Sequence, residues 1–217
     1  MKIGVIVAMD KELEQLRAVL GGSEGLIGGN DVVSCRCGIG KVNAAVGTAE
    51  MIRRHSPDLI VSTGVAGGAD AAINIADVVV GSEYRYHDAY CGKECEAGQI
   101  LGLPAAFRAP ADVVGKALTV GDGSTAVHAG LIVSGDWFVD TPEKMRSILD
   151  TFSEAKAVDM ESCAIAQVCH MQGVPFISFR IISDIPLRHD NTQQYFDFWE
   201  RLATSSFGVT QRFLDTL

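Results

Sequence analysis

Short apolar blocks rich in β-branched residues recur along the chain, separated by polar or glycine-containing stretches. They lie at Ile3–Val7, Leu59–Thr63, Val78–Val80, Leu131–Ser134, Ala157–Val158 and Phe176–Ile182. Nearly unbroken apolar runs of this length are typical of strands that are buried on both faces of a sheet. The pattern therefore predicts a set of interior strands.

Apolar residues with helical spacing lie between several of these blocks. They are Leu13, Leu16 and Leu20, then Val42, Ala45, Val46, Ala49 and Ile52, and then Met145, Ile148 and Leu149. Asp10 and Thr141-Pro142-Glu143 are expected helix starts, because an acid suits the helix dipole and proline is tolerated in the first turn. The alternation of strands and helices indicates a layered α/β architecture.

The stretch from Gln193 to Leu217 is predicted to form one terminal helix, because large apolar residues are spread along it. The residues expected to pack against the rest of the protein are Phe196, Trp199, Leu202, Phe207 and Phe213. A helix that carries so many aromatic residues should cover part of the core.

The composition is that of one globular domain spanning residues 1–217. Apolar residues make up 47% and charged residues 21%, and there is no linker-like stretch. The net charge is −9 and the 18 basic residues are scattered, so no electropositive stripe can bind a nucleic-acid backbone. The apolar run from Ile3 to Met9 is too short for a signal peptide or a membrane span. We expect a cytoplasmic protein without a nucleic-acid or membrane partner.

The six cysteines stand at positions 35, 37, 91, 95, 163 and 169. Their spacing lacks the paired motif of a zinc site, so free thiols in a reducing compartment are expected. His87 with Cys91 and Cys95 offers too few clustered ligands for a metal. The sequence therefore predicts no metal.

Glycine-rich segments raise the question of a phosphate loop. Gly38-Ile39-Gly40-Lys41 is followed by Val42, whereas a nucleoside-triphosphate loop requires Ser or Thr there, and the third glycine of a dinucleotide fingerprint is absent. What remains is a tight turn into a helix, whose free N–H groups could face a polar ligand. The small residues of Thr63–Gly68 would let a ligand approach a strand end.

Charged residues accompany two of the apolar segments. Arg180 and Asp184 flank three residues at the end of an apolar strand, where burying charge is costly without partners. One interpretation is an ion pair between Arg180 and a carboxylate that closes the core. Asp159 and Glu161 stand at the start of an apolar helix, where acids are favoured for structural reasons alone.

A set of longer motifs spans nearly the whole chain in order. They are MKIGVIVAMDKELEQL (1–16), CGIGKVNAA (37–45), STGVAGGA (62–69), YRYHDA (84–89) with GQ (98–99), GLIVSGDWF (130–138), AVDMESCAIAQVCH (157–170), VPFISFRIISD (174–184) and YFDF (195–198). Together they resemble the bacterial 5′-methylthioadenosine/S-adenosylhomocysteine nucleosidases.

The resemblance implies a nucleoside phosphorylase-like fold. This is a three-layer αβα sandwich around a twisted, largely parallel mixed sheet. It also implies a homodimer in which the 90–107 segment lies near the neighbouring active site, and no cofactor.

The implied reaction is hydrolysis of the N-glycosidic bond of an adenine nucleoside with a 5′-thioether, which releases adenine. Asp184 matches the general acid that protonates adenine, with Ser183 orienting its carboxyl group, and burial should raise its pKa. Glu12 matches the base that activates water, and Arg180 would help to hold that water. The resemblance predicts methylthioadenosine and S-adenosylhomocysteine as substrates, with 5′-deoxyadenosine as a further candidate, and it leaves the preference among these and futalosine-type nucleosides open.

The resemblance also implies which residues bind the substrate. Glu161 would accept hydrogen bonds from the ribose hydroxyls with Met160 against the sugar, and Phe138 would stack on adenine. The apolar pocket around the sugar and the 5′ group would contain Met9, Ile39 and Phe196, with Tyr195 as the alternative to Phe196. Asp159 is expected to be structural.

Two other functions remain open. A phosphate-dependent purine nucleoside phosphorylase of the same superfamily would need early arginines, yet Met9-Asp10-Lys11-Glu12-Leu13 stands there and Val65 lacks a hydroxyl that could bind phosphate. A non-catalytic nucleoside-binding domain would be expected to lose Glu12 or Asp184. Because both carboxylates are present, hydrolysis is favoured.

Overall fold

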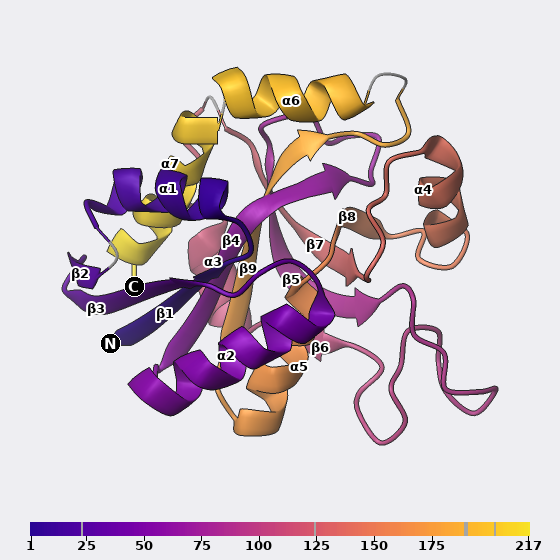
Figure 1. The fold of residues 1–217 in the computed structure, drawn as a ribbon, viewed down its shortest axis with the longest axis horizontal. Helices are drawn as coiled ribbons and strands as arrows, with labels where there is room; N and C mark the ends of the chain where they lie inside the picture. Colours follow the sequence, from indigo (N-terminus) through magenta and orange to yellow (C-terminus); the bar gives the residue numbers. More distant parts are fainter. Residues whose placement is uncertain (23, 124, 189–190, 202) are drawn as a thin grey trace.

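The computed structural model describes residues 1–22, 24–123, 125–188, 191–201 and 203–217 (Figure 1). The strands are β1 (Lys2–Val7), β2 (Glu24–Ile27), β3 (Asn30–Arg36), β4 (Leu59–Gly68), β5 (Val78–Tyr86), β6 (Phe107–Arg108), β7 (Val127–Ser134), β8 (Ala155–Asp159) and β9 (Phe176–Asp184). The helices are α1 (Asp10–Leu20), α2 (Lys41–His55), α3 (Ala111–Ala117), α4 (Pro142–Leu149), α5 (Ser162–Gln172), α6 (Asn191–Arg201) and α7 (Ala203–Asp215). Each predicted apolar block lies within a strand.

Helices cover both faces of one mixed sheet (Figure 1). One core cluster joins the sheet to α2 and α5, and a second joins its other face to α1, α3, α6 and α7. A third, smaller cluster packs α4 against β7 and β8. The predicted three-layer α/β class is therefore confirmed.

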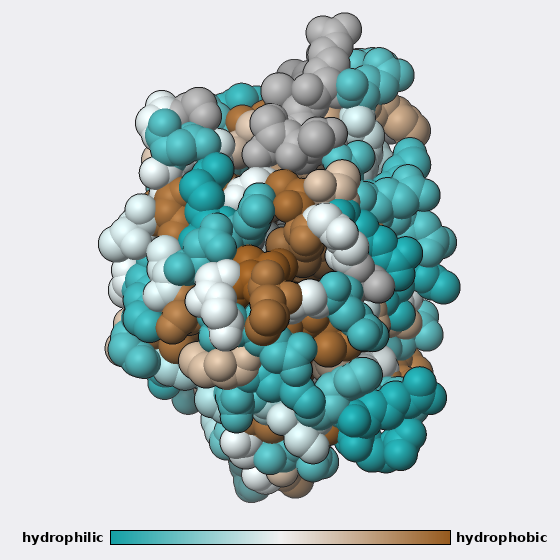
Figure 2. Space-filling view, turned by 90° about the vertical axis from the view of Figure 1, so that its left-hand side faces the viewer, coloured by the Kyte–Doolittle hydropathy of each residue, from teal (hydrophilic) through white to brown (hydrophobic). Residues whose placement is uncertain are grey.

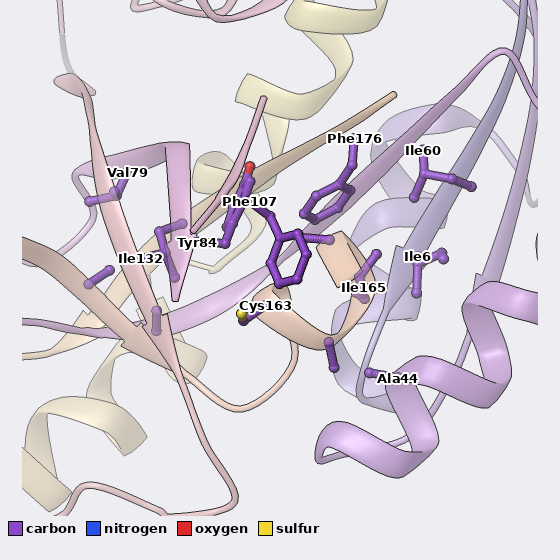
Figure 3. Packing of buried hydrophobic residues seen from close by; sticks show 14 of the residues in the cluster. Ile6, Ala44, Ile60, Val79, Tyr84, Phe107, Ile132, Cys163, Ile165 and Phe176 are labelled. Carbon is purple, nitrogen blue, oxygen red and sulfur yellow. The ribbon is translucent and has the colours of Figure 1, made fainter. Parts of the chain in front are cut away.

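The two main core clusters follow from the twofold alternation of side chains along each strand. In β1, Ile3, Val5 and Val7 belong to the cluster on the α1 side, whereas Ile6 belongs to the cluster on the α2 side. Figure 3 shows Ile6 and Ile60 of neighbouring strands in the same cluster as Ala44 of α2. Strands with apolar residues on both faces bury both rows of side chains, as their sequence predicts.

The sheet closes upon itself, which the sequence did not predict. Its main path runs β2-β3-β1-β4-β8-β7-β5-β6, and β9 pairs with both β4 and β5. The strands β4, β8, β7, β5 and β9 thus form a closed ring. The pairs β4–β9, β5–β7 and β7–β8 are parallel, whereas β4–β8 and β5–β9 are antiparallel.

The expected helix starts are confirmed at both places. α1 begins at Asp10, and in α4 the Thr141 hydroxyl accepts the Lys144 backbone N–H at 3.3 Å, with Pro142 as the first helical residue. The apolar stripe of α2, however, faces outward. Val42 and Val46 are exposed, and the buried residues of this helix are Ala44, Thr48 and Met51.

The C-terminal stretch forms two helices, so the prediction of one terminal helix was wrong. Phe207 and Phe213 of α7 are buried as expected, but Phe196 of α6 is exposed and Phe198 is buried in its place. Phe198 of α6 and Phe207 of α7 belong to the same core cluster, and the Trp199 ring packs on Phe207 with the centroids 6.5 Å apart. Leu202, also expected to pack inside, lies outside the described residues.

The edge of the sheet at β2 was not predicted, because Glu24–Ile27 carries little apolar character. Its Leu26 is 80% exposed. Figure 2 shows the side of the molecule that carries β2, β3 and α1, where apolar residues gather near the middle of a largely polar surface. None of the helices in the described part of the chain is long and apolar enough to cross a membrane.

We predict that Phe213→Ala destabilises the protein by about 3–5 kcal/mol, because it removes a fully buried ring and leaves a cavity. The Phe213 ring packs on Phe179 with the centroids 4.7 Å apart, so α7 would lose this contact with β9. Urea unfolding measures the effect. Leu26→Ala is the matched control and should change the free energy of unfolding by no more than about 0.5 kcal/mol. Equal effects of the two substitutions would contradict this assignment of the core.

Candidate active site

A pocket opens where strand ends meet the loops that follow them. It lies beyond the C-terminal ends of β1, β7, β8 and β9 and along the last residues of β4, and α6 contributes a further side chain. Its lining residues are Ala8, Met9, Glu12, Ile39, Val65, Ala66, Gly67, Trp137, Phe138, Val139, Val158, Asp159, Met160, Glu161, Ser183, Asp184 and Tyr195. Ligands in α/β proteins commonly bind at such carboxyl ends.

Glu12 is fixed by backbone groups from two elements. As the third residue of α1 it reaches back, and its Oε2 accepts the N–H groups of Ala8 and Met9, both at 2.9 Å. Its Oε1 accepts the Val65 N–H of β4 at 3.0 Å. Burial raises the pKa of Glu12, while the Arg180 charge and the three N–H groups oppose that rise. The carboxylate therefore has one fixed position at the pocket wall.

Gly64 permits this arrangement, and the sequence analysis did not assign it a role. A Cβ at position 64 would lie 2.5 Å from Glu12 Oε1 and 2.6 Å from Arg180 Nη1. The run of small residues after Thr63 was the available signal. That run predicts room for a ligand, but at Gly64 the close neighbours are the two charged side chains.

Arg180 lies beneath the pocket, fully buried in β9. Its Nε donates to Asp159 Oδ2 at 2.5 Å and to Ser162 Oγ at 3.0 Å, and its Nη2 donates to Ser62 Oγ at 3.1 Å. The same Nη2 lies 4.0 Å from Glu161 Oε2. The proposed core ion pair with a carboxylate is thus present, and the guanidinium also places positive charge behind two carboxylates that face the pocket.

Asp159 and Glu161 have different surroundings. Asp159 accepts the Ser162 N–H at the start of α5, the hydroxyls of Ser134 and Ser162, and the Arg180 Nε. Glu161 occupies the N-cap position of α5, and its Oε1 accepts the Gly40 N–H at 2.9 Å. Burial and the Asp159 charge raise the pKa of Glu161 to about 7, against the opposing effect of Arg180. Asp159 therefore joins several segments of the protein through its hydrogen bonds. Glu161 accepts fewer hydrogen bonds from protein groups.

Asp184 ends β9 in a pocket position that is mostly closed to solvent. A β-bulge between Ala66 and Gly67 shifts the register so that Gly67 pairs with Asp184. Burial raises the pKa of Asp184 to about 6, and the Ser183 hydroxyl, which donates to Oδ1 at 2.7 Å, counteracts part of this rise. The expected direction of the shift is confirmed.

The apolar wall contains four of the five residues predicted for it. Met9, Ile39, Phe138 and Met160 line the pocket, but Phe196 does not. Tyr195 lies there instead, because neighbouring residues of a helix point about 100° apart. Its ring packs edge-on against Phe138 with the centroids 6.2 Å apart. The prediction for Phe196 is therefore corrected to Tyr195.

Trp137 lines the pocket although the sequence analysis did not single it out, and it stands beside Phe138 in the SGDWF motif. As for metals, residues 1–22, 24–123, 125–188, 191–201 and 203–217 contain no group of three or more His, Cys, Asp and Glu side chains arranged to hold an ion. The ionisable side chains that line the described pocket include the carboxyl groups of Glu12, Asp159, Glu161 and Asp184.

Two of these groups have environments suited to opposite tasks. Asp184 has a raised pKa and a hydroxyl partner, so it can carry a proton near neutral pH. Burial also raises the pKa of Glu12 and so makes its carboxylate a stronger base, while three N–H groups and the nearby guanidinium oppose that rise and hold the ionised form in place. An acid and a base with apolar and aromatic walls between them can cleave a bond to a flat, protonatable leaving group.

Comparison with known proteins agrees with this geometry. The family model of the phosphorylase superfamily matches residues 2–215. Because this match covers nearly the whole chain, the protein is a member of the phosphorylase superfamily.

Individual relatives identify the family within this superfamily. The 5′-methylthioadenosine/S-adenosylhomocysteine nucleosidase of Bacillus cereus (strain B4264) is 34% identical over 231 aligned positions that cover 100% of both chains. The Neisseria meningitidis nucleosidase in complex with methylthio-immucillin-A has a TM-score of 0.92 at 34% identity, covering 100% of this chain and 99% of that one. The Colwellia psychrerythraea 34H enzyme in complex with adenine has a TM-score of 0.92 at 35% identity, covering 100% and 96%. The chain belongs to the 5′-methylthioadenosine/S-adenosylhomocysteine nucleosidase family of the phosphorylase superfamily.

The raised pKa of Asp184 predicts a pH-dependent effect of Asp184→Asn on stability. When a carboxyl group has a higher pKa in the folded than in the unfolded chain, the folded protein loses stability as the pH rises from about 4 to about 7. The amide cannot ionise, so the variant should gain stability relative to the native chain over this range, by up to about 3 kcal/mol. Urea unfolding at pH 4, 5, 6 and 7 measures the difference, and parallel curves for the two proteins would contradict the burial of an ionisable Asp184.

Proposed function

We propose that this protein hydrolyses the N-glycosidic bond of 5′-methylthioadenosine and S-adenosylhomocysteine, with 5′-deoxyadenosine as a further substrate, and releases adenine. The observation that carries the proposal is the pair of buried carboxyl groups, Glu12 and Asp184, in one pocket with apolar walls. Membership of the nucleosidase family supplies the substrate class.

Asp184 acts as the general acid. Adenine is a poor leaving group as an anion, so its imidazole nitrogen must gain a proton as the glycosidic bond stretches. A carboxyl group with a pKa of about 6 retains part of its proton near neutral pH, unlike an ordinary aspartate. The Ser183 hydroxyl fixes the orientation of the carboxyl group. Such proton transfer contributes roughly 10²–10⁴-fold to the rate.

Glu12 activates the water that attacks the anomeric carbon as the ribose gains positive charge. Its burial raises the pKa and makes it a better base, while its three backbone donors keep the carboxylate in place during turnover. Arg180 lies behind Glu12 and Glu161 and balances their charge when both are ionised. An acid on one side of the sugar and a base on the other is the division of roles used in glycoside hydrolysis.

The remaining lining residues bind the substrate. Glu161 accepts the ribose hydroxyls, with Met160 against the sugar, and Phe138 stacks on adenine. Met9, Ile39 and Tyr195 surround the sugar and the 5′-thioether, for which an apolar and polarizable wall is favourable. The relatives crystallised with adenine and with methylthio-immucillin-A support a pocket for the same base.

The composition of the pocket favours water over phosphate as the acceptor. A phosphorylase must bind an oxyanion, for which arginine or lysine side chains are the usual partners. The described residues that line this pocket include neither, and Glu12, Asp159, Glu161 and Asp184 make it acidic. An anion would be repelled where a neutral water molecule is not.

We further propose that the protein is a cytoplasmic homodimer with the 90–107 segment near the neighbouring active site. Val42 and Val46 of α2 are 74% and 65% exposed, and Tyr90 and Leu101 of the segment are exposed as well. The Lys41–Asp88 ion pair keeps the start of α2 beside the beginning of this segment. An exposed apolar helix face of this kind is typical of an interface between subunits. The free cysteines are those of a reducing compartment.

Incubation with methylthioadenosine, with and without phosphate, tests the reaction. The expected products are adenine and free methylthioribose under both conditions. A phosphorylated sugar formed only with phosphate would establish the phosphorylase instead, and binding without turnover would establish a nucleoside-binding domain.

Two substitutions test the catalytic roles. Asp184→Asn should leave nucleoside binding nearly intact and lower kcat by roughly 10²–10⁴-fold, because the amide cannot deliver the proton. Glu12→Gln should likewise abolish hydrolysis. The exposed Asp150→Asn is the matched control and should retain native kcat. If Asp184→Asn kept more than about a tenth of native activity, the acid would have to be another group.

The dimer is tested with Val46→Asp, which places a charge on the exposed apolar face of α2. Light scattering should give the native protein twice the 23.1 kDa mass of the chain, and the variant the mass of one chain. Leu26→Asp, at an apolar position on β2 that is 80% exposed against 65% for Val46, should remain dimeric. A native protein with the mass of a single chain would overturn this assembly.

A further inference from the structure

A cluster of three charged residues, Lys41, Asp88 and Asp136, lies just outside the pocket lining. Asp88 Oδ2 accepts both the Lys41 Nζ at 2.7 Å and the Asp136 backbone N–H at 2.9 Å. Asp136 Oδ1 in turn accepts the Lys41 backbone N–H at 2.8 Å. The cluster therefore connects three segments: the turn before α2, the end of β5 and the loop after β7.

Two of these segments carry walls of the pocket. The turn before Lys41 contains Ile39, which lines the pocket, and Gly40, whose N–H donates to Glu161. The loop after Asp136 continues directly into Trp137 and Phe138, which also line it. A shift of Lys41 or Asp136 would move these walls, although neither charged side chain lines the pocket itself.

Close packing fixes the third segment, the end of β5, against the loop after β7. A Cβ at Gly135 would collide with the His87 ring and lie 2.8 Å from Asp88 Cγ. The His87 ring also packs on Trp137 with the centroids 5.3 Å apart. The end of β5 thus contacts the loop both through the hydrogen bond of Asp88 and through the His87 ring.

The ion pair within this cluster is largely shielded from solvent. The Asp88 side chain is 9% exposed and that of Lys41 28%, and the Lys41 Nζ lies 5.5 Å from the centre of the Tyr86 ring. Burial alone would raise the pKa of Asp88, but the bonds from Lys41 and from the Asp136 N–H lower it overall. A shielded, hydrogen-bonded pair of this kind constrains its neighbours more than an exposed ion pair does.

We propose that Asp88 is a positioning residue for substrate affinity, acting through Lys41 and Asp136 to hold the Ile39–Gly40 turn and the Trp137–Phe138 segment at the spacing the nucleoside requires. This inference rests on the proposed function, since it concerns the same pocket. Asp88 itself does not line the pocket, so its removal affects binding more than the chemical step.

Steady-state kinetics with methylthioadenosine, calorimetric binding of adenine and thermal unfolding test the proposal on four variants. Asp88→Ala and Lys41→Met should each raise both KM and the adenine Kd about tenfold, the effect of losing one charge-assisted hydrogen bond, with kcat reduced less than about threefold. Lys41→Arg keeps the pair and should stay near native values. Glu83→Ala, which breaks the Glu83–Arg108 ion pair on the same strand β5, is the matched control and should leave KM and Kd unchanged.

The energetic coupling between Asp88 and Lys41 gives a second test of the proposal. The double variant Asp88→Ala with Lys41→Met should be no weaker in adenine binding than the weaker single variant, because both remove the same interaction. The proposal is overturned if Asp88→Ala lowers Tm while KM and Kd stay native, since its role would then be structural only. It is also overturned if Glu83→Ala raises Kd equally.

Failure of the proposed function would look different. A native protein that binds adenine without cleaving methylthioadenosine would contradict the hydrolase, while the adenine Kd values would still decide the role of Asp88. A native protein that neither cleaves the nucleoside nor binds adenine would contradict both.

Discussion

The buried charge of Arg180 is the constraint on which the rest of the site depends. A guanidinium in the interior requires carboxylate partners, and Asp159 supplies the direct one through a hydrogen-bonded ion pair. Glu12 and Glu161 also lie within its field, so three carboxyl groups surround one cation. Burial first, and then the negative charge of the neighbouring Asp159, explain why the pKa of Glu161 rises to about 7. Through its hydrogen bonds the same cation links β9 to β8, to β4 and to the start of α5.

The closed ring of strands brings these groups together. β4 and β9 run side by side, which places Gly64 opposite Arg180 and Gly67 opposite Asp184. Because β4 also pairs with β8, the Asp159 end of β8 lies against the same part of the ring. Only glycine at position 64 leaves room for the Glu12 carboxylate beside the guanidinium. The position of the pocket is therefore a consequence of the topology of the sheet.

The contrast between Glu12 and Asp184 arises from their neighbours. Both are buried, but Glu12 has Arg180 and three backbone N–H groups, whereas Ser183 is the partner that counteracts the burial of Asp184. Burial thus raises the pKa of both carboxyl groups, and the two differ in the neighbours that oppose this rise: a guanidinium and three N–H groups at Glu12, and a hydroxyl group at Asp184. The cluster of Lys41, Asp88 and Asp136 supports the pocket from outside, since it fixes two of the pocket walls without contributing to the lining.

The sequence by itself determined the interior strands, the starts of α1 and α4, and eight of the 17 residues that line the pocket, because apolar runs, capping residues and family motifs are local signals. Only the tertiary structure decided that the α2 stripe containing Val46 faces outward, that Tyr195 rather than Phe196 enters the pocket, and that Gly64 makes room for Glu12. Periodicity indicates that a helix has an apolar face but not what that face contacts. Closure of the sheet and the close approach of distant side chains depend on pairings between segments far apart in the chain, which no local pattern records.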